Sequence, residues 1–195
     1  MTTRKNAENM PTNSTNKGVS LIEMLAAVAI FAITIGAISG LFISAIRTQR
    51  RILATQELLD QTSYVLEYMG RALRMAKKDT SLVCLLTAKN YENGIDWIRF
   101  LKFESATATD VCYYFYLSGN RIYESKGGAV GVPLTSDKIS VNFLKFNLSG
   151  DIIGESPNLQ PRVTIYLEVL GKGATGEQPK IQIQTSISQR PLDSP

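Results

Sequence analysis

The 195-residue sequence contains no histidine and only two cysteines, Cys84 and Cys112. The lack of histidine removes the commonest general base and the commonest metal ligand of proteins. Two cysteines alone cannot complete a four-ligand zinc site, and a catalytic cysteine would have no histidine as its base. The sequence therefore predicts no metal site, no cofactor and no catalytic residues. Only carboxylates far apart in the sequence could still form an enzyme site.

A large excess of charge of one sign is also missing. The formal net charge is +4, from 21 basic and 17 acidic residues. Residues 1–18 carry three basic residues and one acidic residue, so their removal leaves a charge of +2. An excess this small does not indicate nucleic acid or another anionic surface as a partner.

Charged residues are absent from Met24 to Ile46, a run of 23 residues. About 20 apolar residues in a helix suffice to cross the hydrocarbon core of a bilayer, so the run predicts a membrane span. Glu23 directly precedes it. An ionised carboxylate at bilayer depth costs roughly 2.5 to 3.5 kcal/mol, which makes Glu23 a candidate functional residue. The alternative is that Glu23 lies in the headgroup layer.

The residues before the run form a recognisable pattern. Lys17 and Gly18 are followed by Val19, Ser20, Leu21, Ile22 and Glu23, and then by the apolar helix. This pattern resembles the prepilin signal of type IV pilins, pilin-like minor subunits and type II secretion pseudopilins. The family usually has phenylalanine where this chain has Val19. The resemblance covers about the first quarter of the chain.

The resemblance implies how the chain is processed and assembled. A prepilin peptidase on the cytoplasmic face would cut between Gly18 and Val19 and methylate the new amine of Val19. Glu23 would then pair with the N-terminal amine of a neighbouring subunit. Other pilin or pseudopilin subunits and an inner-membrane assembly platform are the implied partners. The chain would first lie in the cytoplasmic membrane, with its C-terminal domain outside, and then in a pilus or pseudopilus at the cell surface. An uncleaved membrane anchor is the alternative.

Five segments are expected along the chain. They are a leader (1–18), a membrane and filament-core helix (19–46), an amphipathic helical stem (47–78), a β-rich head (79–190) and a tail (191–195). Within the core helix, small residues recur every fourth position at Ala32, Gly36, Gly40 and Ser44. Such a stripe lets helix backbones approach closely and predicts a packing face. Small residues are also common in any membrane helix, which is the alternative.

The stem is predicted from an apolar repeat that continues to about Lys78. Ile52, Leu59, Leu66 and Leu73 are spaced by seven, with Thr55, Thr62, Met69 and Ala76 between them, and Leu58, Val65 and Ala72 widen the stripe. This pattern fits either a coiled coil or a helix packed on a sheet. The strands that follow favour the second arrangement.

Strands are predicted from β-branched, aromatic and alternating runs after Asp79. They span 96–103, 111–117, 121–124, 139–148, 163–169 and 181–188. A tight turn at 118–120 joins the second and third, and the change of phase between Phe143 and Leu144 predicts a bulge. The expected fold is therefore α+β: a long N-terminal membrane-spanning helix packed on a mainly antiparallel β-sheet, as in pilins.

Three further motifs have a structural explanation. Residues 171–176 match the G-x-G-x-x-G fingerprint, but Pro179 and a strand follow where a nucleotide site needs a helix, so a hairpin loop is expected. Cys84 and Cys112 are expected to form a disulfide outside the cytoplasm, with two buried thiols as the alternative. The aromatic run Tyr113–Tyr116 is expected to contribute to the core, with a ligand platform as the alternative.

These features predict a structural subunit and not an enzyme, placed among the minor or tip components of a pilus or pseudopilus. The alternative is a binding module, such as a tip adhesin or a DNA-capture subunit. That function needs an exposed basic or aromatic patch, and the basic residues of the head are too scattered in sequence to reveal one.

Overall fold

The computed structural model describes residues 18–150, 160–171 and 178–190. The chain divides into two compact units, 1–47 and 48–195. Helix α1, Leu21–Arg74, contributes residues to both units. Lys17, most of the expected leader, residues 172–176 of the glycine motif and the expected tail lie outside the described residues.

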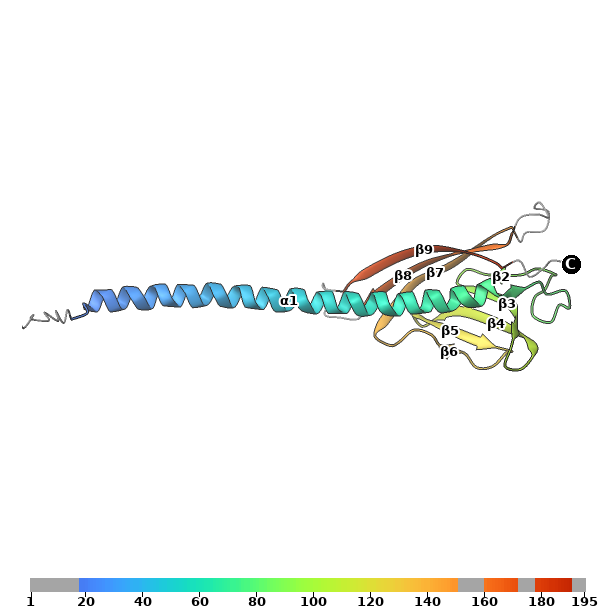
Figure 1. The fold of residues 1–195 in the computed structure, drawn as a ribbon, viewed down its shortest axis with the longest axis horizontal. Helices are drawn as coiled ribbons and strands as arrows, with labels where there is room; N and C mark the ends of the chain where they lie inside the picture. Colours follow the sequence, from blue (N-terminus) through green and yellow to red (C-terminus); the bar gives the residue numbers. More distant parts are fainter. Residues whose placement is uncertain (1–17, 151–159, 172–177, 191–195) are drawn as a thin grey trace, which may run out of the picture. The chain divides into compact units, whose positions relative to one another are not determined.

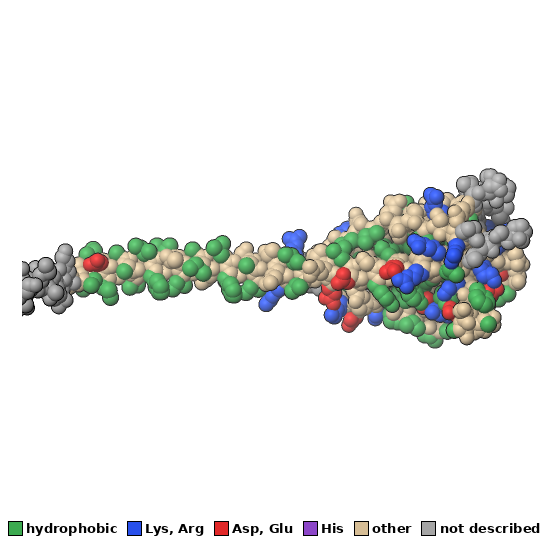
Figure 2. Space-filling model, viewed as in Figure 1, with side chains coloured by type: hydrophobic (Ala, Val, Ile, Leu, Met, Phe, Trp, Pro, Cys, Tyr) green, Lys and Arg blue, Asp and Glu red, His purple; other side chains and the backbone are tan. Residues whose placement is uncertain are grey.

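The first unit is an exposed apolar helix. Every residue from 18 to 45 is exposed, and Figure 2 shows hydrophobic side chains along the face of this part of the helix that is in view. An 18-residue window of α1 has a mean hydropathy of 2.4 and no buried residue. By length and composition this segment can cross a membrane. No described residue of its own unit covers this apolar surface, which lipid or other helices can cover.

The second unit packs residues 48–74 of α1 against antiparallel strands, which confirms the α+β prediction (Figure 1). Among the described residues the strands form two sheets. The first holds β1 (Ala76–Lys77), β3 (Trp97–Glu104), β4 (Thr109–Ser118), β5 (Arg121–Lys126) and β6 (Val132–Pro133) in that order, with β2 (Glu92–Asn93) also paired to β3. The second holds β7 (Ile139–Ser149), β8 (Arg162–Gly171) and β9 (Lys180–Ser188) in that order. One core joins the helix to both sheets.

The helix buries the second half of the predicted stripe and leaves part of its first half exposed. Ile52 and Leu59 are exposed, whereas Leu58, Thr62, Val65, Met69, Ala72 and Leu73 are buried. The apolar side chains among these buried ones share one core with residues of both sheets. The stem therefore packs on sheets, as the strands that follow it predicted.

The helix also ends earlier than predicted. It stops at Arg74, four residues before the expected end at Lys78. Ala76 and Lys77 instead form β1, which pairs antiparallel with Lys102 and Leu101 of β3. Pairing with a neighbouring strand overrides the helical pattern there, because sheet hydrogen bonds satisfy backbone groups that a helix end leaves open.

The turn between β4 and β5 is a tight one, as predicted. Gly119 and Asn120 both have positive φ, 53° and 65°, and Ser118 pairs with Arg121. Two residues with φ > 0 are typical of a type I′ hairpin turn.

The bulge in β7 exists but lies one to two residues earlier than predicted. The register shifts between Val141 and Phe143. Phe143 consequently points outward and is 49% exposed, while Leu144 and Phe146 return to the core. The predicted position of the change of phase, between Phe143 and Leu144, is therefore wrong, because the change comes before Phe143.

Candidate processing and assembly site

The helix of the first unit begins with a capping pattern that the sequence reasoning missed. The backbone N–H groups of Glu23 and Met24 donate to the Ser20 carbonyl oxygen, at 3.0 and 3.1 Å. These are the first backbone bonds of the helix. In sequence, Ser20 and Glu23 also have the S-x-x-E spacing of a capping box, and Glu23 lies in the first turn of α1. A carboxylate at this position favours the positive end of the helix dipole, so Glu23 can stabilise the start of its own helix.

The residues at the expected cleavage bond are open to solvent. Gly18 and Val19 precede the helix, and Val19 is 66% exposed. A Cβ atom added to Gly18 would meet no atom within 4 Å. The chain's own fold therefore does not require glycine at this position.

The expected packing stripe lies on the exposed part of α1. Ala32, Gly36, Gly40 and Ser44 are all exposed, and open space surrounds a Cβ added to Gly36 or Gly40. Their four-residue spacing keeps them on neighbouring turns of one face. The stripe is available to a second helix, and its role stays a prediction.

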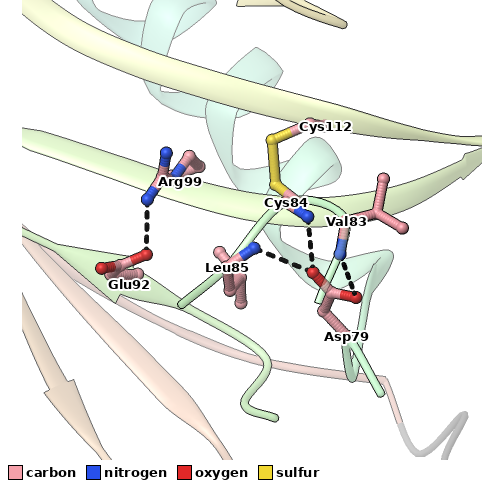
Figure 3. The surroundings of a disulfide bond; sticks show 7 residues. All are labelled: Asp79, Val83, Cys84, Leu85, Glu92, Arg99 and Cys112. Carbon is pink, nitrogen blue, oxygen red and sulfur yellow. Dashed lines mark hydrogen bonds and ion pairs between the residues drawn. A yellow bond between two sulfur atoms is a disulfide. The ribbon is translucent and has the colours of Figure 1, made fainter. Parts of the chain in front are cut away.

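The second unit contains the predicted disulfide. Cys84 and Cys112 are bonded, which ties the loop after α1 to β4 (Figure 3). Tyr113 and Phe115 of the neighbouring aromatic run are buried in the core, as expected, whereas Tyr114 and Tyr116 lie on the other face of the sheet. A disulfide is typical of a domain outside the reducing cytoplasm.

A buried carboxylate holds the loop that carries Cys84. Asp79 is fully buried and accepts backbone N–H bonds from Val83 at 3.2 Å, Cys84 at 2.7 Å and Leu85 at 2.8 Å (Figure 3). Burial by itself raises the pKa of Asp79, but the bonds from these N–H groups outweigh it, so the pKa lies below its ordinary value. The ionised carboxylate thus fixes the loop in position for the disulfide. No sequence motif marks this role.

No cluster of three or more histidine, cysteine or acidic side chains suited to a metal ion occurs in the described part of the chain. A buried ionic group of the second unit joins two of its elements. Glu124, which is buried, accepts hydrogen bonds from Tyr68 at 2.9 Å and lies 3.3 Å from the Lys126 ammonium. This group links helix α1 to β5.

The described residues together define a class: an α+β protein with a membrane-capable N-terminal helix, exposed residues 18–20 directly before it and a disulfide-bridged β domain. Residues 13–39 match the prokaryotic N-terminal methylation motif, so the chain carries a type IV prepilin-like signal. The match supports a type IV pilin- or pseudopilin-type subunit. Neither a curated protein nor a solved structure matches the chain significantly.

Proposed function

We propose that the chain is a pilin-like structural subunit that a prepilin peptidase cuts between Gly18 and Val19 and methylates at Val19. The mature chain then joins a type IV pilus or a secretion pseudopilus, with help from an inner-membrane assembly platform, as a minor or tip component. The observation that carries the proposal is the methylation motif at residues 13–39, placed at the start of a helix with no cover of its own.

The exposed helix supports assembly on physical grounds. Apolar side chains from residue 24 to residue 46 can be covered by lipid before assembly and by other helices afterwards. The small stripe at 32, 36, 40 and 44 suits close helix packing in either setting. The membrane is then a temporary environment for a helix whose lasting position is a filament core.

Glu23 would determine how the helices of neighbouring subunits align along the filament core. Removing an unpaired carboxylate and an unpaired amine from water is costly for both groups. Pairing Glu23 of one subunit with the Val19 amine of its neighbour offsets both costs. Inside a single chain Glu23 forms no ion pair with any described residue, so its charge is available to a neighbour.

Cleavage can be tested at Gly18 without disturbing the fold. Gly18→Ala should slow cutting severalfold, because the peptidase must approach the backbone closely while the chain itself has room for the added methyl group. Val19→Phe is the matched control and should be cut normally. Electrophoretic mobility in cells that contain the peptidase gives the readout. Gly18→Ala protein that migrates with the mature wild type would contradict the assignment.

A further inference from the structure

A short loop after α1 and β1 displays aliphatic side chains to solvent. Residues 79–89, which we call the aliphatic loop, lie in the segment that leads from β1 to β2 (Figure 1). Leu82, Val83 and Leu86 are 56, 74 and 79% exposed, whereas Cys84 and Leu85 between them are buried. None of the three exposed side chains belongs to the core that the described residues form. Packing within the fold therefore does not explain why these positions are apolar.

Contacts at its base and its centre hold the aliphatic loop in one shape. The Asp79 N–H donates to the Lys89 carbonyl oxygen at 2.9 Å and so joins the two ends of the loop. The Asp79 carboxylate accepts N–H bonds from residues 83–85, and the bond between Cys84 and Cys112 ties the loop to β4 (Figure 3). Compact loops whose ends meet are frequently functional. A preformed loop also loses little conformational freedom when it binds a partner.

Leu82 has an unusual backbone conformation for a leucine. Its φ is 53°, in the left-handed region that glycine adopts at much lower cost. The side chain is exposed, so no buried contact offsets this strain. A strained residue held in place by its surroundings indicates a function, and an exposed leucine indicates a function toward a partner.

The charges around the aliphatic loop are positive. The only carboxylate within residues 79–89 is that of Asp79, which is buried and bonded to backbone N–H groups. Lys78 and Lys89 flank the loop, and neither forms an ion pair with a carboxylate in the described ranges. Aliphatic side chains flanked by ammonium groups complement acyl chains beneath anionic headgroups.

A protein partner fits this surface less well than a bilayer does. A specific protein interface buries roughly 800 Å² on each partner, far more than three aliphatic side chains can offer. Such interfaces also depend on tryptophan, tyrosine and arginine, and residues 79–89 contain none of these. Binding at a bilayer surface needs only modest apolar area together with attraction to anionic lipids.

We propose that the aliphatic loop inserts Leu82, Val83 and Leu86 into the boundary between headgroups and acyl chains of an anionic phospholipid bilayer. Lys78 and Lys89 then lie at the level of the headgroup phosphates. This activity goes beyond the role in assembly and requires only the folded second unit. Its test is therefore independent of cleavage and of filament formation.

The test uses the full chain, held by α1 in nanodiscs of phosphatidylcholine and mixed with vesicles that contain phosphatidylglycerol. Flotation of the vesicles measures the bound fraction. The wild type should float with the vesicles, and less of it should do so as salt is added. Val83→Ser and Leu86→Ser should each weaken binding about tenfold, because each removes an inserted aliphatic side chain. Lys78→Ala and Lys89→Ala should each weaken it about fivefold.

Leu82→Gly separates binding from folding. Glycine relieves the left-handed backbone at this position, so the melting temperature should be no lower than that of the wild type. Binding to the vesicles should nevertheless weaken about tenfold. Val130→Ser is the matched control, because Val130 is 91% exposed and lies outside the aliphatic loop. This variant should bind within twofold of the wild type.

Four results would overturn the proposal. The wild type could fail to float with the vesicles, or Val130→Ser could weaken binding as much as Leu86→Ser does. Equal binding to vesicles of pure phosphatidylcholine, unchanged by loss of the lysines, would contradict the anionic surface. Pairing of nanodiscs without vesicles, abolished by Leu86→Ser, would assign the loop to a second copy of the chain.

Discussion

Glu23 occupies a position that serves the helix as well as a neighbouring subunit. Its carboxylate lies in the first turn of α1, where it favours the positive end of the helix dipole, and it has the capping-box spacing from Ser20. A defect in Glu23→Ala therefore has two explanations, a weakened helix start and a lost ion pair. Glutamine also satisfies the capping box but carries no charge, so it separates the two.

Both Glu23→Ala and Glu23→Gln should be cut normally and should fail to assemble, with filament yield reduced at least tenfold. The physical reason is the loss of the charge that pairs with the Val19 amine. Quantifying sheared filaments beside the processed membrane pool measures both steps. Normal yield from Glu23→Gln would show that the carboxylate acts through helix capping alone.

Asp79 predicts a pH dependence localised to the disulfide loop. Its pKa is lowered below the ordinary value of 3.8, so its stabilising contribution is fully present above that value and is lost as the pH falls through the lower folded-state pKa. Asp79→Asn should destabilise the second unit by about 1 to 3 kcal/mol, because it removes a charged acceptor of three N–H bonds.

Hydrogen exchange of the Val83, Cys84 and Leu85 amides measures this effect. In the wild type, protection should fall as the pH drops below about 4, after correction for the intrinsic exchange rate. In Asp79→Asn the same amides should exchange faster at neutral pH and show little further change on acidification. Equal protection in the two proteins at neutral pH would contradict the role of Asp79.

At the scale of elements, the strands that were easiest to predict are those whose environment is uniform. Alternation in β8 correctly placed Val163, Ile165, Leu167 and Val169 in the core, because one face of that strand packs inward along its whole length. The end of α1 was harder, because β1 competes with the helix for Ala76 and Lys77. That competition depends on β3, which is distant in sequence.

The arrangement of β7 shows a second limit of local patterns. The change from one alternating apolar pattern to another correctly predicted a bulge in this strand. Both patterns consist of residues that a strand can bury, so the sequence alone does not show where the change occurs. Only the pairing with β8 determines where β7 has an additional residue relative to its partner strand. This pairing places Phe143 on the outer face of the sheet. The sequence also predicted the N-terminal signal, because its residues are contiguous. The contacts of Asp79 depend on the folded loop, and no sequence motif marks them.

The small-residue stripe of α1 can be tested with two identical substitutions. Ala32→Leu places a large side chain on the stripe, and Ala27→Leu places the same side chain on roughly the opposite face of the helix. Both variants stay apolar enough for membrane insertion. If the stripe is a packing face, Ala32→Leu should lower filament yield about fivefold, equivalent to about 1 kcal/mol per contact, and Ala27→Leu should change it less.

Filament yield is compared with the amount of processed subunit in the membrane, so that expression differences are removed. The reverse order of effects, with Ala27→Leu the more damaging, would assign packing to the other face. Equal yields from all three proteins would remove the stripe from the assembly interface.

At the scale of the whole molecule, the chain combines an exposed apolar segment with a domain that has its own core. The second unit buries its own core between helix and sheets and closes a loop with a disulfide. The first unit contributes a helix whose apolar surface is entirely exposed. This division is what a subunit needs if it is held in a membrane first and in a helical filament core later.

Intact-mass spectrometry of the chain recovered from sheared filaments tests the account most directly. It should find a polypeptide that lacks residues 1–18, begins with a singly methylated Val19 and retains the bridge between Cys84 and Cys112. A chain that keeps residues 1–18, has an unmethylated amine or is absent from the filaments would contradict the account.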